Sequence, residues 1–559
     1  METQFLEISN GTAISRKEIP NLTFDVFREN AVKLVRNNAK IVQFFGYEDI
    51  DNDSYKNSNA IKLLAVLRTN RVHAGRHYTL FAATCDAPSS YPSLTLECEP
   101  FHLFEREIAE QFGIVPEGHP WLKMVRYHPN SQGRPDVFGN DYAKDSQGNY
   151  YYKDDIPGNY PYYSVEGKEI HEVAVGPVHA GVIEPGHFRF NCIGEKVLHL
   201  EIQLGYQHRG VEELIPKAEP KRLPIIIESI AGDTSVANAV SFAQVIESLI
   251  HKEYKEQRHK DHKEHRFQPD TGAKKIRTIA LELERIANHV GDLGALSGDV
   301  AFLPPANYFG RMRGDFLNMT LLICGNRFGK GLVRPGGVRF SIETSLREEL
   351  MRRINELEIQ VANVIELLLI TTPSVRDRFE DCGVVSRSDA HELGLVGPAG
   401  RACGLSYDAR RAFPTEYYPN IDIPENAKST GDVYARATVR ADEIMQSIAI
   451  IKNLLQEPIE TSIENSCLGF KDNQIDKGNS KLLSDFAPDS FVVTINEAWR
   501  GELSHSILTD KNGKIIRYKI KDPSFHNWSG LAMSLRNTEI SDFPLNNKSY
   551  NLSYCGFDL

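Results

Sequence analysis

The sequence has few cysteines and no two of them arranged as C-x-x-C. Its eight cysteines stand singly along 559 residues, at positions 85, 98, 192, 324, 382, 403, 467 and 555. Iron–sulfur clusters and structural zinc sites need closely grouped ligands, usually paired cysteines. Scattered cysteines in a long chain are typical of small buried apolar side chains. We therefore expect no iron–sulfur or structural zinc site carried by this chain alone.

Long apolar runs and targeting signals are also missing. A membrane-spanning helix needs about 18–20 apolar residues, and the best candidate, VIELLLI at 364–370, is far shorter. The start, METQFLEISNGTAISRKEIPNL, has neither a basic segment followed by an apolar block nor a small-residue cleavage site. No G-x-G-x-x-G follows a predicted strand, so a dinucleotide site is not expected. We expect a cytosolic chain, or one held by partners on the cytosolic face of a membrane.

An excess of positive charge is absent too. The 64 basic and 75 acidic residues give a formal net charge of −11, which argues against a general nucleic-acid binder. Hydrophobic residues make up 41% and charged residues 25% of the chain, as in ordinary folded proteins. At about 100–200 residues per domain, this length predicts two to four domains.

The patterns that are present predict an α+β protein with two unequal parts. Residues 1–125 read as a small α/β domain, with one helical segment and several short apolar runs of strand length. Residues 126–170 are rich in Gly, Pro, Asn, Asp and Tyr and read as a linker that lies on a surface. Residues 171–559 open with an alternating, hairpin-like segment, FRFNCIGEKVLHLEIQLG, and are mainly helical after it.

Three long amphipathic segments support the helical prediction: IRTIALELERIANHVGDLGAL, SLREELMRRINELEIQVANVIELLLI and YARATVRADEIMQSIAIIKNLLQ. A charged insert at 251–275 carries His251, His259, His262 and His265. Histidines three or four apart on a helix are able to share a zinc ion. A solvated helical extension is the alternative, and the interleaved Lys and Arg favour it.

Several motifs carry a family resemblance. EREIAEQFGIVPEGHP (105–120) resembles the small hydrophilic subunit that accompanies the quinone-site subunit of respiratory complex I. GPVHAGVIEPGHFRF, LGYQHRGVEEL, LELERIANHVGDLG, RPGGV, GPAGRACGLSYDAR and RGEL follow in the order found in the quinone-site subunit and in the large subunit of energy-converting (group 4) nickel–iron hydrogenases. The union of both parts in one chain resembles the large subunit of formate-hydrogenlyase-type complexes.

The resemblance implies a metal centre that this sequence lacks the thiolates to hold. The hydrogenase family binds nickel and iron through two C-x-x-C pairs, because such a centre needs soft ligands. On the family pattern the first pair falls on Ala231 and Thr234, and the second near Ser553 and Gly556. Cys555 is one position off the second pair. We predict a branch of the family without the nickel ligands, with no metal bound by its own residues.

Without these thiolates, the loops around the four positions resemble the quinone pocket of complex I. In that pocket a His and a Tyr give protons to the reduced ring. His187 is the counterpart of the His, with His179 as the alternative, and Gly232 stands where the family has its Tyr. We predict that Asp233 and His187 form a proton relay, since a carboxylate raises the pKa of a nearby imidazole. Capping of the helix that follows is a second reading of Asp233.

The resemblance also implies partners and places other charged residues. Arg209, Arg285, His289 and Arg334 are expected at an interface or along a proton path, with Glu184, Glu212 and Asp292 as weaker candidates. The expected partners are a small subunit with an iron–sulfur cluster and antiporter-like and anchor subunits in the membrane. The expected function is electron transfer from that cluster to a small carrier, for which a quinone is a candidate. A redox-inactive coupling or scaffold subunit is the alternative, and an active hydrogenase is nearly excluded.

Overall fold

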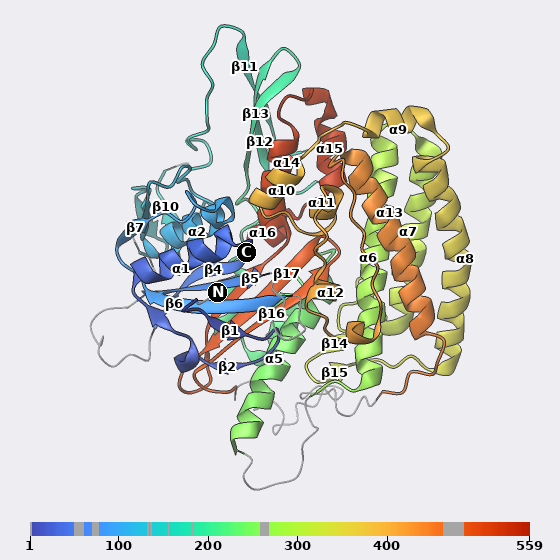
Figure 1. The fold of residues 1–559 in the computed structure, drawn as a ribbon, viewed down its shortest axis with the longest axis horizontal. Coiled ribbons are helices and arrows are strands. Elements are labelled where there is room, and N and C mark those ends of the chain that lie inside the picture. The colour runs from blue at the N-terminus through green and yellow to red at the C-terminus, as the bar shows by residue number, and fades with distance from the viewer. Residues whose placement is uncertain are drawn as a thin grey trace.

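The computed structural model describes residues 3–49, 61–69, 78–130, 133–134, 137–154, 156–179, 183–257, 268–461 and 486–559, without the side chains of 251–257. The predicted α+β class is confirmed. Two sheets lie beside a bundle of long helices, and a narrow β-ribbon projects from the body (Figure 1).

The N-terminal part is an antiparallel sheet with helices packed on it, as the apolar runs predict. The strand order is β1-β6-β5-β4, and β3 pairs in parallel with β6. Phe27, Ala31 and Leu34 form the buried face of α1, at the spacing of a helix stripe. The elements are β1 (Leu6–Ile8), β3 (Asn21–Leu22), α1 (Phe24–Arg36), β4 (Lys40–Glu48), β5 (Ile61–Thr69), β6 (Thr79–Asp86), β7 (Ser90–Pro92), α2 (His102–Phe112) and β8 (Val115–Glu117).

A second sheet joins the two ends of the chain, and the sequence patterns missed it. Its order is β18-β17-β16-β2, so the N-terminal β2 (Ile14–Ser15) pairs with a C-terminal strand. Every residue of β16 and β17 is buried, including polar ones such as Asn496, Glu502 and His505. The alternation that marks a half-buried strand is therefore absent. The three strands are β16 (Ser490–Ala498), β17 (Gly501–Thr509) and β18 (Ile515–Lys521).

The three predicted long helices are confirmed as α6 (Thr271–Asp299), α8 (Thr344–Leu369) and α13 (Val433–Leu454). With α7 (Leu303–Cys324) they form the bundle at the right of Figure 1, and α5 (Ser235–Gln257) lies between this bundle and the second sheet. Among the described residues, no helix is long and apolar enough to cross a membrane.

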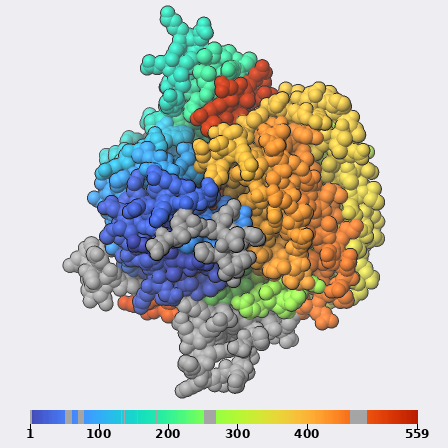
Figure 2. Space-filling model, in the orientation of Figure 1, coloured from blue at the N-terminus to red at the C-terminus, as the bar shows by residue number. Residues whose placement is uncertain are grey.

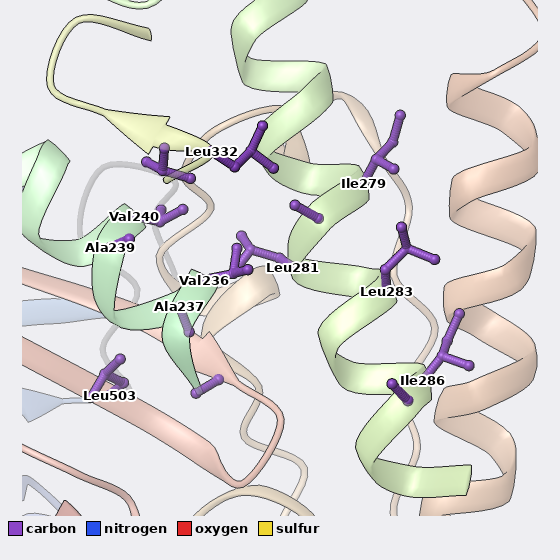
Figure 3. Close-up of a cluster of buried hydrophobic side chains, with 14 of the residues drawn as sticks. Val236, Ala237, Ala239, Val240, Ile279, Leu281, Leu283, Ile286, Leu332 and Leu503 are labelled. Atoms are coloured by element: carbon purple, nitrogen blue, oxygen red, sulfur yellow. The ribbon is translucent and has the colours of Figure 1, made fainter. Parts of the chain in front are cut away.

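A large apolar core fills the space between α5, the bundle and the second sheet. Figure 3 shows Val236 and Val240 of α5 facing Leu281 of α6, while Ile279 and Leu283 point to the other side of α6. Burial of such side chains stabilises the fold by about 1.5–3 kcal/mol each. This core fixes the start of α5, which carries the candidate site, against α6.

The predicted hairpin is confirmed as β12 (His187–Ile193) and β13 (Lys196–Gln203), with β11 (Ile170–Val175) added on its edge. This ribbon forms the projection at the top of Figures 1 and 2. The segment before it contains a short hairpin, β9 (Tyr142–Lys144) with β10 (Tyr150–Tyr152). It packs on the body through a small cluster around Met124, Ile156 and Tyr160.

The two parts of the chain are joined by buried charges. Nine residues of α2 are buried, four of them charged, although its sequence looks like a solvated helix. Glu107 on α2 lies 2.9 Å from Lys519 on β18. The domain limits given above stay a prediction. Of the insert 251–275, the four histidine side chains lie outside the described residues, so its zinc and solvated-helix readings also stay open.

The remaining elements connect these layers. They are α3 (Val211–Lys217), α4 (Leu223–Ile227), β14 (Val333–Arg334), β15 (Gly337–Val338), α9 (Pro373–Phe379), α10 (Arg387–Glu392), α11 (Gly397–Ala402), α12 (Ala409–Ala412), α14 (Ser524–Ser534), α15 (Phe543–Tyr550) and α16 (Tyr554–Phe557).

Candidate functional site

Arg500, in the turn between β16 and β17, ties together the two loops that the family resemblance singles out. Its two terminal nitrogens donate to the carboxylate of Asp233, over 2.8 and 2.7 Å. Its Nε donates to the backbone carbonyl of Asn551, just before α16. The guanidinium also lies 3.8 Å from the ring centroid of Trp499. The loop before α5 and the loop before α16 therefore meet at one buried cation.

Asp233 is held ionised by this contact. Desolvation by itself would raise the pKa of its carboxyl group, but the charge and hydrogen bonds of Arg500 hold that pKa below its ordinary value. The Thr234 hydroxyl adds a hydrogen bond of 2.9 Å. About a third of the Asp233 side chain remains exposed. The site thus presents a fixed ion pair with an accessible edge.

The N-terminus of α5 is capped by Glu284 of α6. The alternative role predicted for Asp233, capping of this helix, is taken by Glu284. The Glu284 carboxylate accepts hydrogen bonds from the backbone N–H of Val236 and Ala237. These are amides that a helix leaves without an internal partner. Burial raises the pKa of Glu284 to about 8, although both amide bonds lower it, and the nearby negative charge of Asp233 raises it further.

The four positions where the family carries thiolates now have other roles. Ala231 is fully buried, and the hydroxyl of Thr234 accepts from the indole N–H of Trp499. Ser553 caps α16 by accepting from the backbone N–H of Gly556. A Cβ added at Gly556 would lie 2.8 Å from Asp522 and Ser553, so no larger side chain fits there without a shift.

Cys555 is the one cysteine beside this site among the described residues. Burial, reinforced by the carboxylate of Glu184, raises the pKa of its thiol to about 11. Metal binding needs the thiolate, which is disfavoured here. A single protonated thiol with Ala, Thr, Ser and Gly at the other positions does not fit a nickel–iron centre. Among the described residues, no group of three or more His, Cys, Asp or Glu side chains is placed to hold a metal ion.

Gly232 leaves an open space at the edge of the site. It is exposed, and a Cβ placed on it would meet no atom within 4 Å. This is the position where the resemblance implies a phenol in complex I. The space beside Asp233 is therefore open to the surface of the chain.

His187 lies at the start of β12, next to the C-terminal loop. A Cβ on its neighbour Gly186 would touch the ring of Tyr554. The imidazole packs against Tyr162, with ring centroids 4.8 Å apart, and its Nε2 is buried without a hydrogen-bond partner among the described residues. Burial and the charge of Arg189 lower the pKa of His187. His179, the alternative, lies 3.0 Å from the Gly186 carbonyl through its Nε2.

The predicted relay between His187 and Asp233 is not formed. Neither side chain hydrogen-bonds to the other, because Asp233 is engaged by Arg500 while His187 faces Tyr162. A long-range pair between a loop and a distant turn leaves no periodic signal in the sequence. Arg500 lies in RGEL and Glu284 in LELERIANHVGDLG, and neither motif indicates these contacts.

Arg209 and Arg334 both brace the loop that carries Asp233. Arg209 donates to the backbone carbonyls of Ser229 and Ile230, over 2.6 and 2.8 Å. Arg334 pairs with Glu228 at 3.0 Å, and Glu228 precedes the same loop. Both arginines therefore set the position of the loop. Their predicted place at an interface with another subunit is not tested by these contacts.

Arg285 and His289 belong to a buried charge network behind the site. Arg285 lies 3.3 Å from Glu282 and 3.5 Å from Glu443, and His289 lies 2.9 Å from Glu443. Asn551, which accepts from Arg500, donates to Asp292. The ion pair at Asp233 is thus connected to Asp292 through Asn551, by its backbone carbonyl on one side and its side-chain amide on the other. Glu212 lies elsewhere, paired with Arg517 and Lys519.

Two cavities of about 100 and 80 Å³ are formed by other residues. The larger lies between α2, β13 and α14, and the smaller lies around Arg126, His128 and His208. None of the residues predicted to line the family cavity lines either of them.

Comparison with known families agrees with the two-part reading. A family model described as respiratory-chain NADH dehydrogenase, 30 Kd subunit, matches residues 28–142. A second, described as the 49 Kd subunit, matches residues 299–558.

The curated relatives include subunits of hydrogenases and subunits of NADH-quinone oxidoreductases. The chain is 27% identical to the carbon monoxide-induced hydrogenase of Rhodospirillum rubrum over 67% of this chain and 95% of that protein. It is 26% identical to hydrogenase-4 component G of Escherichia coli (strain K12), over 84% of this chain and 76% of that protein. Formate hydrogenlyase subunit 5 of the same organism is 25% identical, over 81% of this chain and 74% of that protein. The last two matches extend over more of this chain than the first.

Proposed function

Since the chain joins a domain of the 30 Kd family and a domain of the 49 Kd family of respiratory-chain NADH dehydrogenase subunits in one polypeptide, we propose that it is a hydrophilic subunit of a membrane-associated oxidoreductase complex. In this proposal it passes electrons from an iron–sulfur cluster of a partner subunit to a small carrier. The carrier binds over Gly232, at the edge of the Asp233–Arg500 pair, and a quinone is the candidate.

The single observation behind this proposal is the convergence of the two loops on Arg500, with no thiolate set between them. At the positions where the similar hydrogenases hold metal, this chain has Ala, Thr, Ser and Gly. The thiol of Cys555 keeps its proton. What remains is an open space beside an ion pair. Such a place suits an uncharged ring, because the Asp233–Arg500 pair carries no net charge and the space beside it is open.

The protein's own residues would hold protons near that carrier. In this proposal His187, whose pKa is lowered and whose buried Nε2 has no hydrogen-bond partner among the described residues, hydrogen-bonds to a carrier oxygen. Glu284, with a pKa of about 8, is able to exchange a proton close to Asp233. Coupling of these steps to ion movement in membrane subunits is part of the same proposal.

A redox-inactive scaffold subunit is the second candidate, and one observation favours it. Both carboxylate oxygens of Asp233 are used by Arg500, and behind the pair His289 contacts Glu443 and Arg440 contacts Asp292. In that case the subunit would transmit structural change to a membrane arm without receiving electrons.

The test uses the complex isolated through this chain, with its iron–sulfur cluster reduced in the absence of oxygen. Addition of duroquinone should reoxidise the cluster, as followed by electron paramagnetic resonance. Gly232→Phe should slow reoxidation at least tenfold by filling the open space, whereas Gly298→Phe, at another exposed glycine with open space, should not. Unchanged rates in Gly232→Phe contradict the carrier site. A reducible cluster that duroquinone leaves reduced supports the scaffold.

A further inference from the structure

A cavity of about 100 Å³ lies at the junction of the two parts of the chain, away from the Asp233 loop. Its walls come from α2 and the segment after it on one side, and from β13 and α14 on the other. Residues that decide its chemistry are His102, Arg106, Trp121, His199, Trp528 and Phe557. None of these has a role in the proposed electron transfer, so the inference below does not depend on that proposal.

Three polar groups in the wall have unused hydrogen-bonding capacity among the described residues. His102 Nδ1 and His199 Nε2 are buried without a partner. Arg106 is 5% exposed and uses Nε and Nη2 to bond the carbonyls of Lys123 and Met124 and the Tyr160 hydroxyl, which leaves Nη1 without a bond. Unpaired buried polar groups are rare in folded proteins and indicate an unseen partner. Here two of them, His102 Nδ1 and His199 Nε2, line one cavity.

The rest of the wall is aromatic. Trp121, Trp528 and Phe557 contribute rings, and the Arg106 guanidinium lies 5.7 Å from the Trp121 centroid. The His102 ring is nearly parallel to Trp121, at 10°. Burial lowers the pKa of His102 well below its ordinary value and lowers that of His199, so both imidazoles stay neutral at neutral pH. The charged groups of the wall are therefore Arg106, Arg536 and Glu99, and burial raises the pKa of the Glu99 carboxyl group while the charge of Arg536 lowers it.

We propose that this cavity binds a small aromatic anion, a single six-membered ring that carries a carboxylate. A closed apolar cavity of about 150 Å³ binds benzene, so at about 100 Å³ this cavity has room for no more than one such ring, with its charged group at the exposed Arg536. The ring would lie against the tryptophans, and the carboxylate would accept from Arg106 Nη1 and pair with Arg536. The neutral imidazoles would donate or accept the remaining hydrogen bonds.

A ligand in this cavity would contact residues that are attached to the C-terminal segment around α16. Trp528 donates its indole N–H to the Ser553 carbonyl over 3.4 Å, and Phe557 belongs to α16. Both residues thus connect the cavity wall to the segment that carries Cys555. Occupancy should therefore hold α16 and α2 together across the junction of the two parts.

The test is a titration of the full chain with benzoate by isothermal calorimetry, with tryptophan emission as a second signal. Two of the chain's three tryptophans line the cavity, so the emission reports on it directly. We expect saturable binding and a matching change in emission. Benzyl alcohol, which lacks the charge, and cyclohexanecarboxylate, which lacks the aromatic ring, should each bind at least fivefold more weakly.

Variants locate the site. Ala532→Phe fills the cavity from α14 and should raise the Kd for benzoate at least tenfold, while Asn307→Phe, on the exposed face of α7, should leave it unchanged. If Ala532→Phe fails to fold by circular dichroism, Arg536→Gln at the exposed rim serves instead and should raise the Kd at least threefold. The proposal is overturned if benzoate gives no saturable heat, or if the folded cavity variant binds it as the unchanged chain does.

Discussion

Arg500 and Asp233, separated by 267 positions in the sequence, form a two-bonded ion pair with N–O distances of 2.8 and 2.7 Å. The arginine is buried, whereas the carboxylate keeps an exposed edge. The pair joins the start of α5 to the loop before α16, because Arg500 also bonds the Asn551 carbonyl. The geometry of the candidate site therefore depends on one guanidinium.

Removal of that guanidinium should destabilise the fold. Arg500→Met leaves Asp233 without its partner, and breaking a buried pair costs about 3–5 kcal/mol. The exposed edge of Asp233 reduces this, so we expect a loss of about 2–3 kcal/mol in the free energy of unfolding, measured by urea denaturation. Arg311→Met, which breaks the exposed pair with Asp315, should cost under about 1 kcal/mol. Equal midpoints for Arg500→Met and the unchanged chain would contradict this role.

The same pair predicts a pH dependence. The pKa of Asp233 is lowered from 3.8 in the folded chain, so its ionised form stabilises the fold above about pH 4 and this contribution is lost as the pH falls through the folded pKa. The difference in unfolding free energy between the unchanged chain and Asp233→Asn should therefore be largest near pH 6 and shrink toward pH 3. A difference that stays constant over this range would show that the charge is not involved.

The contribution of Glu284 to the free energy of unfolding should change with pH in the opposite direction. Its pKa is raised from 4.5 to about 8, so the unfolded chain loses this proton at lower pH than the folded chain does. Its ionisation thus lowers stability progressively between about pH 4.5 and 8, by at most about 1.4 kcal/mol per pH unit. Glu284→Gln keeps an amide oxygen for the α5 N-terminus and should become more stable relative to the unchanged chain as the pH rises from 5 to 8. Parallel stability curves for the two proteins would refute the raised pKa.

The thiol of Cys555 should be unreactive in the folded chain. With its pKa raised to about 11, fewer than about one in a thousand molecules carries the thiolate at pH 7.5. Iodoacetamide at this pH should leave the Cys555 peptide unmodified in native protein and label it fully in urea, as read by mass spectrometry. Rapid labelling of the native thiol at pH 7.5 would mean that it is ionised and able to bind a metal.

Lys519 should hold the two parts of the chain together. Its amino group lies 2.9 Å from Glu107 and 3.0 Å from Glu212, and all three side chains are buried. Lys519→Met should cost about 3–5 kcal/mol, whereas Lys17→Met, at an exposed pair with Asp489, should cost under about 1 kcal/mol. Thermal unfolding monitored by circular dichroism compares the two variants. Similar losses of stability in both would contradict a stabilising role of the buried Lys519 contacts.

The amphipathic helices were predictable because their packing is periodic. In α6 and α8 the apolar residues recur at helical spacing, and the alternating hairpin of β12 and β13 was equally visible. The sheet of β16 to β18 was not, since polar residues such as Asn496 and Glu502 are buried there on internal partners. In such strands neither face is marked by hydrophobicity.

The site was predictable only in its location. The family resemblance indicated the loops around Asp233 and Cys555, and these loops do meet. The partner of Asp233 was not predictable, because Arg500 is far away in the sequence and a turn leaves no pattern that identifies its contacts. Glu284 was hidden for a similar reason: on α6 it looks like one of several alternating surface charges, and only the packing of α5 shows its role.

The nickel content of the complex isolated through this chain tests the absence of a nickel–iron centre most directly. Elemental analysis by mass spectrometry gives nickel and iron per chain, with the hydrogenase-type positions Ala231, Thr234, Ser553 and Gly556 unchanged. We predict iron from a partner's cluster and nickel far below one atom per chain. One nickel atom per chain would contradict the central claim, because the residues around Arg500 would then hold a metal that their chemistry does not suit.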